Sequence, residues 1–337
     1  MKEAAFYEKI DLNAVRCRLC RQNCKIEDGC RGFCGVRENK EGILYTLVYD
    51  KIVSTNVDPI EKKPLFHVVP GTKSFSIATM GCNFRCTFCQ NFSISQPPHE
   101  NGTISGASYL PSELVSMAVD SGCESIAYTY TEPTVYYELA RDTMTLAKKA
   151  GLLNVFVTNG YMSRKMLDDA RGLIDAANVD LKAFDDKFYT QYCQARLKGV
   201  LDSLKYIKQM GVWLEVTTLL IPGLNDDDSQ VRNLARFIKS ELGRETPWHV
   251  SRFFPRYKEL GLPPTDASVL RRVRQMGIDE GLYYVYTGNL PWESGEKTYC
   301  PGCSYALIDR VGYTIEKYAI KEGRCPKCGY QVEGLGV

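Results

Sequence analysis

The segment that starts at Cys82 carries three cysteines at close spacing. Cys82, Cys86 and Cys89 form a C-x3-C-x2-C pattern, and no fourth cysteine lies near them in the sequence. Iron–sulfur cubanes are usually held by four thiolates. A site with three protein ligands leaves one metal corner open to a small molecule, as catalytic metal sites do. The pattern therefore predicts a catalytic iron–sulfur site, with an unrelated zinc site or an incidental thiol cluster as the alternatives.

A second group of cysteines lies near the N-terminus. Five thiols fall between positions 17 and 34, one more than a tetrahedral site needs. Thiolate ligation suits either zinc or an iron–sulfur cluster, and the sequence leaves both open. We expect Cys30 to be the spare thiol. The expected ligands are Cys17, Cys20, Cys24 and Cys34.

The third group lies near the C-terminus and consists of two C-x2-C pairs. They are Cys300 with Cys303 and Cys325 with Cys328, and 21 residues separate the pairs. A strand-like stretch between them would form a hairpin that brings the pairs together. Four thiolates at this spacing can close a tetrahedral site. We expect a zinc-ribbon-like tail that binds Zn2+ and has a structural role.

Composition limits the classes of function. The chain has 337 residues and 14 cysteines, with 42 basic and 40 acidic residues. No apolar run is long enough to span a bilayer, and the first residues lack the apolar core of a secretory signal. We therefore expect a cytoplasmic location, where thiols stay reduced and serve metals rather than disulfides. The balanced charge gives no reason to expect a nucleic acid or a membrane as partner.

The chain between the second and third cysteine groups alternates strands and helices. Continuous apolar strands are typical of a parallel sheet that is covered on both faces. Right-handed βαβ units then predict an α/β fold, a partial (β/α)6 TIM-like barrel, with an open doubly wound sheet as the alternative. The expected strands are 75–80, 124–130, 154–159, 177–184, 212–221 and 248–254, with 283–288 as an additional strand. The expected helices are 111–122, 133–151, 163–175, 200–211, 228–243 and 266–277.

This organisation predicts three regions. Residues 1–72 form a Cys-rich metal-binding region, 73–290 form the barrel, and 291–337 form the zinc-ribbon-like tail. In either sheet architecture, function lies at the carboxyl ends of the strands. The three-cysteine loop follows the first of these strands, so its partners are expected at the ends of the later ones.

A C-x3-C-x2-C loop after the first strand of a βα barrel resembles the radical S-adenosylmethionine (SAM) superfamily. The resemblance covers roughly residues 75–290. It implies that Cys82, Cys86 and Cys89 hold a [4Fe-4S] cluster with SAM on its open iron. It further implies that the reduced cluster cleaves SAM to a 5′-deoxyadenosyl radical, which abstracts hydrogen from a substrate.

The same resemblance implies roles for five further residues. Phe88 matches an aromatic residue that packs near the adenine of SAM, and Asn159 matches a segment at the ribose. Lys182 is implied as a contact of the SAM carboxylate or of a substrate anion. Ile221 begins a loop that is similar to the adenine-side loop of glycyl-radical-enzyme activases, with a plain strand-to-helix turn as the alternative. Glu132 is implied as an acceptor for the SAM amino group.

The segment around Glu132 departs from the family pattern. Where the family has Gly-Gly-Glu-Pro, this chain has Tyr130-Thr131-Glu132-Pro133. The missing glycines put a close approach of the backbone to SAM in doubt. A second interpretation is that Glu132 favours a helix N-terminus, with Pro133 at the first helical position.

Further segments resemble one subgroup, the radical SAM protein of the AmmeMemoRadiSam system, which is related to pyruvate formate-lyase activating enzymes. The segments are residues 59–67, 89–91, 130–133 and 34–39. This resemblance implies an oxidoreductase or activase-like enzyme with a flavodoxin- or ferredoxin-type electron donor. It also implies Memo-like and AMMECR-like partner proteins, and a small molecule or a protein as substrate. The specific reaction is left open.

The alternative function is a non-catalytic multi-zinc module that binds RNA or protein. Arginine-rich helix faces such as the one around Arg271 would be its contact surface, although charged faces are more often simply solvated. The two functions predict different colours, because an iron–sulfur protein is brown and a zinc protein is colourless.

Overall fold

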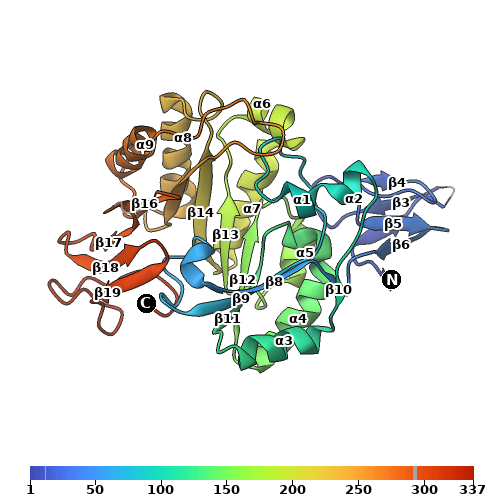
Figure 1. The fold of residues 1–337 in the computed structure, drawn as a ribbon, viewed down its shortest axis with the longest axis horizontal. Helices are drawn as coiled ribbons and strands as arrows, with labels where there is room; N and C mark the ends of the chain where they lie inside the picture. Colours follow the sequence, from blue (N-terminus) through green and yellow to red (C-terminus); the bar gives the residue numbers. More distant parts are fainter. Residues whose placement is uncertain (12, 291–293) are drawn as a thin grey trace.

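The computed structural model describes residues 1–11, 13–290 and 294–337, and its centre is a single eight-stranded sheet (Figure 1). The strand order is β16-β15-β14-β13-β12-β11-β9-β8, so parallel neighbours follow each other in sequence. This order is that of a partial barrel and lacks the reversal of a doubly wound sheet. The predicted fold class is confirmed. The parallel strands are β9 (Lys73–Ala78), β11 (Ser125–Tyr128), β12 (Leu153–Thr158), β13 (Ala176–Asp180), β14 (Trp213–Leu220), β15 (Trp248–Arg252) and β16 (Val285–Gly288).

The predicted helices are present, with differences at their ends. The helix predicted over 163–175 ends at Asp169, and Gly172 beyond it has a φ of +78°, the left-handed conformation typical of a helix stop. The longer helices are α3 (Pro111–Asp120), α4 (Tyr137–Lys149), α5 (Arg164–Asp169), α7 (Leu197–Gln209), α8 (Asp228–Phe237) and α9 (Ala267–Asp279). Short pieces are η1 (Ile60–Lys62), α1 (Phe92–Ser95), α2 (Pro97–Glu100), η2 (Pro133–Tyr136), α6 (Asp186–Phe188), η3 (Tyr189–Cys193), η4 (Ile238–Leu242) and η5 (Ser294–Glu296). No helix in these described ranges is both long and apolar enough to cross a bilayer.

The N-terminal region forms small sheets, and its last strand joins the main sheet. That strand, β8 (Ser54–Pro59), pairs antiparallel with β9, so part of the region predicted over 1–72 forms the edge of the barrel sheet. One small sheet contains β1 (Lys2–Glu3), β6 (Ile43–Thr46) and β5 (Arg37–Lys40), and another contains β2 (Tyr7–Lys9), β3 (Val15–Cys17) and β4 (Lys25–Ile26). A third pairs β7 (Lys51–Ile52) with β10 (Ala107–Ser108).

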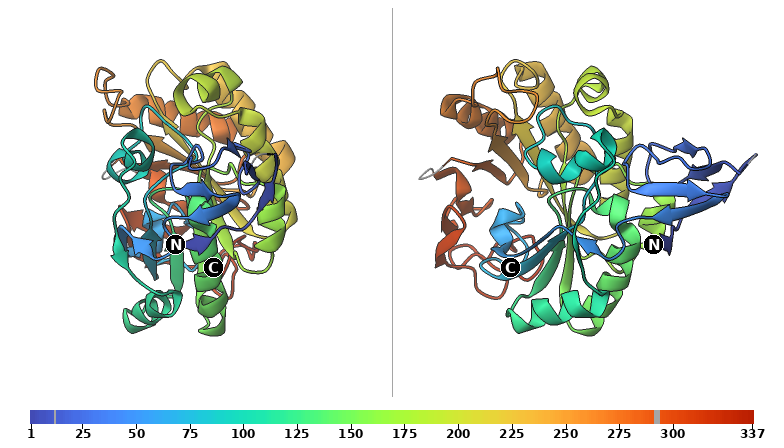
Figure 2. Two further views of the ribbon diagram at one scale, coloured as in Figure 1. Left: turned by 90° about the vertical axis from the view of Figure 1, so that its right-hand side faces the viewer. Right: turned by 45° about the vertical axis from the view of Figure 1, so that its right-hand side comes forward.

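The tail forms a three-stranded antiparallel sheet at the other end of the molecule. Its strands are β17 (Thr298–Tyr299), β18 (Ala306–Val311) and β19 (Thr314–Tyr318). Residues 291–293 of the predicted tail lie outside the described residues. The views agree that the N-terminal sheets and the tail flank the barrel on opposite sides (Figures 1 and 2).

A buried ion pair joins the N-terminal region to the barrel helices. Arg37 Nη2 lies 2.5 Å from Glu138 Oε1, and each side chain is only 2% exposed. Glu138 Oε1 also accepts the amide of Ala5 at 2.7 Å. The charges therefore satisfy each other and fix β5 against α4.

Removal of one member of this pair should be strongly destabilising. We expect Glu138→Ala to lower the free energy of unfolding by about 3–5 kcal/mol, because the Arg37 charge stays buried without its partner. The double replacement Arg37→Met with Glu138→Leu should lose less, since no charge is then buried alone. Urea unfolding followed by circular dichroism measures both. A double variant less stable than Glu138→Ala would contradict this account.

The interior at the amino ends of the strands is filled by a polar cluster. Glu215 of β14 accepts the amides of Phe66 and His67 at 3.0 and 2.8 Å and lies 2.6 Å from His249 Nε2. His67 Nδ1 lies 2.7 Å from the carbonyl oxygen of Glu333 in the tail. The segment after η1 therefore joins the open edge of the barrel to the tail.

This cluster predicts a pH dependence of stability. Burial lowers the pKa of His67 from 6.5 to about 4. Between these values the unfolded chain binds more protons than the folded chain, so the free energy of unfolding falls as the pH drops through the window. From pH 7 to pH 5 the wild type should lose about 2 kcal/mol more than His67→Gln. Urea midpoints at the two pH values test this, and equal losses in both proteins would refute it.

Candidate active site

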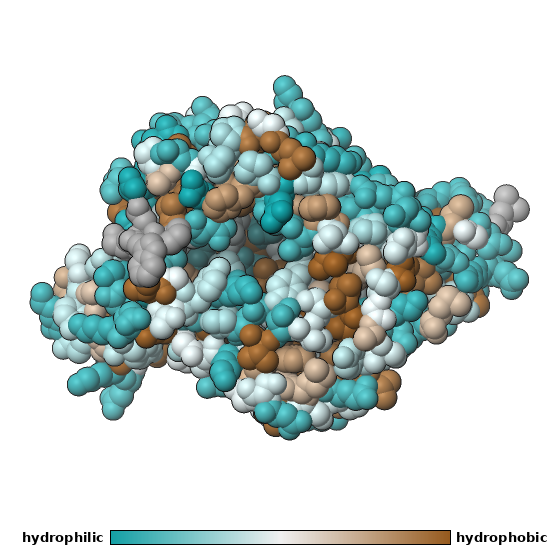
Figure 3. Space-filling view, in the orientation of Figure 1, coloured by the Kyte–Doolittle hydropathy of each residue, from teal (hydrophilic) through white to brown (hydrophobic). Residues whose placement is uncertain are grey.

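The three-cysteine loop lies where parallel sheets carry their sites, at the carboxyl end of β9. Cys82, Cys86 and Cys89 line one cavity of about 320 Å3. Side chains that follow the other strands complete its wall, and a hollow rimmed mainly by hydrophilic residues is visible near the middle of this face (Figure 3). The other wall residues include Phe88, Thr129, Tyr130, Asn159, Asp180, Lys182, Thr217 and Ser251.

A glycine begins the loop because the chain packs closely there. Gly81 has a φ of +99°, and a Cβ at this position would lie 2.6 Å from Cγ1 of Val36. Further along the loop, the amides of Arg85 and Thr87 donate to the carbonyls of Cys193 and Tyr192, each at 3.0 Å. The N-terminal region and η3 therefore hold the loop from two sides.

The thiols of the loop lie among hydrogen-bond donors. The amide of Phe84 donates to Cys82 Sγ at 3.3 Å, and Asn159 Nδ2 donates to the same sulfur at 3.7 Å. A hydrogen bond with Cys193 lowers the pKa of the Cys86 thiol against the effect of burial, and the charge of Lys182 acts in the same direction. Cys193, which stands alone in the sequence, thus lies beside the three-cysteine loop.

Lys182 places a positive charge in the wall. Its Nζ lies 2.9 Å from Asp180 Oδ2 and 5.9 Å from the centre of the Phe88 ring. Burial opposes this charge, yet Asp180 and the nearby thiols raise the pKa of Lys182 above its ordinary value. The cavity therefore carries a Lys182–Asp180 ion pair beside the three thiols, and its ammonium can turn to an anionic group of a ligand.

Glu132 does not line the cavity. Its Oε1 accepts from the Thr134 amide at 3.1 Å and from Thr158 Oγ1 at 2.7 Å, and its Oε2 accepts the Asn159 amide at 2.8 Å. The side chain is fully buried and starts η2, as the helix-start interpretation describes. Its contacts show a role in positioning the segment that carries Asn159.

Tyr130 stands where the family pattern has glycine, and its backbone explains the pattern. Its φ is +63°, a left-handed conformation that favours glycine. The hydroxyl donates to Asp58, which also lies 2.6 Å from Lys63 Nζ. Burial lowers the pKa of Lys63 to about 8. Tyr130 and Lys63 both line the cavity, and neither side chain is predicted there from the spacing of the motifs.

Of Phe88 and Ile221, only Phe88 lines the cavity. Phe88 lines the cavity and packs on Phe188, with 5.6 Å between ring centres. Ile221 is fully buried, and its amide donates to Asn225 Oδ1 at 2.7 Å. Asn225 in turn donates to the Lys182 carbonyl at 2.6 Å. The structure thus brings together the three thiols, Phe88, Asn159 and Lys182, and leaves Glu132 and Ile221 behind the wall.

A second cavity adjoins the first. It has a volume of about 550 Å3 and shares Lys62, Thr217, Ser251 and Asn289 with the first cavity. Its remaining wall reaches the tail at Glu296 and Tyr313. The two cavities therefore share part of their wall, and the second extends toward the side of the molecule that carries the tail.

The tail cysteines form a compact tetrad. The Sγ atoms of Cys300, Cys303, Cys325 and Cys328 all lie within 4.8 Å of one another. Cys300 Sγ is 3.5 Å from Cys328 Sγ, and Cys303 Sγ is 3.7 Å from Cys325 Sγ. This spacing suits one tetrahedral metal ion.

The comparisons with known proteins agree with this geometry. The family model described as Radical SAM superfamily matches residues 76–237. The uncharacterized protein MJ0808 of Methanocaldococcus jannaschii is 46% identical over 336 residues, which cover 99% of each chain. The pyruvate formate-lyase 1-activating enzyme of Escherichia coli K12 is 24% identical over 174 residues, 50% of this chain and 70% of the enzyme.

Solved structures show the same fold at low sequence identity. Streptococcus suis SuiB bound to S-adenosylmethionine matches with a TM-score of 0.53 and 14% identity, over 74% of this chain and 58% of SuiB. The match supports the barrel architecture and carries no information on substrate.

Proposed function

The chain belongs to the radical SAM superfamily, and from this premise we propose that Cys82, Cys86 and Cys89 hold a [4Fe-4S] cluster next to a SAM site. The observation that carries the proposal is the convergence of the three thiols, Asn159 and Lys182 on one cavity at the carboxyl ends of the strands. Membership of this superfamily and a site with three thiols argue against the non-catalytic zinc module.

The residues present fit such a group. Three thiols supply fewer ligands than a closed site requires, which leaves room for SAM as a further ligand. Phe84 and Asn159 direct N–H groups at the Cys82 sulfur, and hydrogen bonds of this kind tune iron–sulfur clusters. A volume of about 320 Å3 is within the range of small-molecule sites.

Held by Cys82, Cys86 and Cys89, a [4Fe-4S] cluster would supply the one-electron chemistry for reductive cleavage of SAM and hydrogen abstraction from a substrate. The residues of the chain bind SAM and orient it. Lys182 pairs with the carboxylate of SAM, and Asn159 donates or accepts hydrogen bonds at its polar groups. Phe88 provides an aromatic face for the adenine.

We further propose that the substrate enters through the second cavity and is a segment of a partner protein. The similarity to a pyruvate formate-lyase 1-activating enzyme supports an activase-like reaction, and the cavity volume of about 550 Å3 supports a short extended peptide as occupant. A small molecule is the alternative substrate. A flavodoxin- or ferredoxin-type protein would donate the electron in the cytoplasm, and Memo-like and AMMECR-like proteins are the partners to supply in assays.

The test is anaerobic incubation of the reconstituted protein with SAM and a reductant, followed by mass spectrometry for 5′-deoxyadenosine. We expect this product, and we expect its yield to rise when the true substrate is present. Deuterium that passes from a labelled partner protein into 5′-deoxyadenosine would identify a protein substrate. An iron-loaded protein that leaves SAM intact would overturn the proposal.

A further inference from the structure

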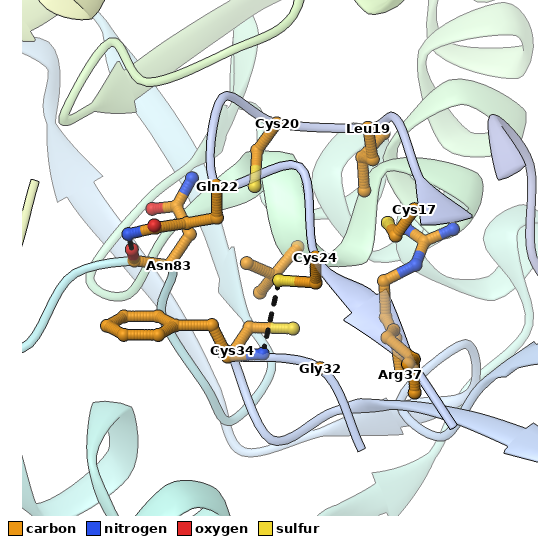
Figure 4. Close-up of a pocket in the computed structure, with 12 residues that line it drawn as sticks. Cys17, Leu19, Cys20, Gln22, Cys24, Gly32, Cys34, Arg37 and Asn83 are labelled. Carbon is orange, nitrogen blue, oxygen red and sulfur yellow. Dashed lines mark hydrogen bonds between the residues drawn. The ribbon is translucent and has the colours of Figure 1, made fainter. Parts of the chain in front are cut away.

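The N-terminal cysteines form a separate site beside the proposed active site. Cys17, Cys20, Cys24 and Cys34 line one small cavity of about 20 Å3, and Figure 4 shows their thiols facing a common space. Cys30 is exposed and is not part of this wall. The structure therefore selects the same four thiols that the spacing predicts.

The spacing of these thiols differs from that of the tail tetrad. Within the described chain, the tail tetrad is the one set of three or more candidate metal ligands whose atoms all lie within 4.8 Å of one another. The N-terminal thiols are therefore spread more widely, as are the thiols of the three-cysteine loop, and a cavity lies between them. One zinc ion draws its four sulfurs together, because each Zn–S bond is only about 2.3 Å long. A four-iron cube holds its thiolates farther apart, since each is bound to a different iron atom.

Two buried N–H donors indicate what kind of metal group the four thiols would hold. Arg37 and Asn83 line the cavity, and they are 2% and 0% exposed. Arg37 Nε and Asn83 Nδ2 are both buried without a hydrogen-bond partner. A buried N–H without a partner is costly. The sulfide and thiolate sulfurs of a cluster would accept from both groups, while the Arg37 charge stays paired with Glu138.

Much of the remaining wall is apolar. Leu19, Ile26 and Val135 line it, and the Phe33 amide donates to Cys24 Sγ at 3.4 Å. Burial and hydrogen bonds to sulfur are the protein features that stabilise and tune iron–sulfur clusters.

We infer that Cys17, Cys20, Cys24 and Cys34 bind a second [4Fe-4S] cluster with four thiolate ligands and no open corner. This inference does not depend on the proposed function. The two sites share a connection, because Gln22 Nε2 donates to the Asn83 carbonyl at 2.9 Å and Asn83 directly follows Cys82.

The test removes the first site and asks whether iron remains. The triple variant Cys82→Ala, Cys86→Ala, Cys89→Ala is purified without oxygen after reconstitution with iron and sulfide. We expect about four iron and four sulfide atoms per chain, a brown colour, and an electron paramagnetic resonance signal after reduction. A colourless triple variant with about two zinc ions per chain, one in the tail and one at the N-terminal thiols, would overturn the inference.

Matched variants locate the iron. Cys20→Ala added to the triple variant should remove the remaining iron, whereas Cys30→Ala added to it should keep the iron. Zinc bound by the tail reports that each variant has folded. If the triple variant does not fold, Mössbauer spectra of the wild type decide instead. Two cluster populations, of which SAM alters one, support the inference, and a single population that SAM alters entirely refutes it.

The outcomes separate the two proposals. An iron-free triple variant, together with a wild type that cleaves SAM, would refute the second cluster alone. Iron retained in the triple variant, together with a reconstituted wild type that never cleaves SAM, would refute the proposed function alone.

Discussion

Replacement of Cys86 by alanine should abolish SAM cleavage. Cys86 is the most buried of the three loop thiols, its thiol is hydrogen-bonded to Cys193, and the charge of Lys182 acts on it. With two ligands left, the loop cannot hold a four-iron cluster that also keeps a corner open for SAM. We expect the rate of 5′-deoxyadenosine formation to fall at least about a thousandfold, which corresponds to about 4 kcal/mol.

The control is a second buried thiol outside both cavities. Cys123, at the start of β11, is 5% exposed and lines neither cavity. Cys123→Ala removes the same atom and should keep both the iron content and the rate near those of the wild type. If Cys86→Ala retained more than a tenth of the wild-type rate, Cys86 would not be a cluster ligand.

The second largest expected effect concerns the zinc site predicted in the tail, and it is an effect on stability. Structural zinc in small domains contributes about 10–16 kcal/mol of binding free energy at neutral pH, and this energy is coupled to folding. Cys325→Ser removes one ligand of the tetrad. We expect the variant to lose its zinc and the amides of β18 to exchange at least about a hundredfold faster, equivalent to about 2.7 kcal/mol.

The effect should spread from the tail into the barrel edge. Arg310 of β18 donates to the Phe66 carbonyl at 2.7 Å, and Tyr284 donates to Glu333 at 2.7 Å. Both contacts depend on an ordered tail, so exchange at residues 65–69 should also accelerate. Lys317→Ala, on the exposed face of β19, should change neither zinc content nor exchange. Unchanged protection of β18 in zinc-free Cys325→Ser would show that the metal does not hold the tail.

Much of the barrel follows from local sequence patterns. The strand predicted over 154–159 is β12 (Leu153–Thr158), because a buried parallel strand reads as a continuous apolar run. β8 was not predicted as part of the sheet. Its segment Ser54–Pro59 is polar and mostly exposed, and only its antiparallel partner β9 makes it a strand. The short N-terminal strands are likewise set by tertiary packing rather than by their own periodicity.

The candidate site likewise has one part that local sequence spacing predicts and another that depends on tertiary packing. Thiol spacing is a local property, so the sequence was sufficient to predict the loop at Cys82. Glu132 is hydrogen-bonded to Thr158 at the end of β12 and to Asn159, the residue after it. Asp58 lies in β8, and its contacts Lys63 and Tyr130 lie outside that strand. Such encounters depend on the register between strands, which a single sequence does not specify. For this reason the same Glu132 is compatible with a SAM contact in sequence and with a helix start in the structure.

The contact between His67 and Glu333 has a kinetic consequence. The two residues are 266 positions apart in the chain, and pairs at such separation form late because a long loop must close first. The same contact lies at the border of the second cavity, close to Phe66 in its wall. The segment Phe66–Val69 and the tail hold each other through several such contacts, so this edge of the barrel should open as one unit when the tail detaches. The lifetime of the contact between His67 and Glu333 would then set the rate at which a bulky partner segment enters or leaves the second cavity. Motions of the strands that precede the thiols would matter less.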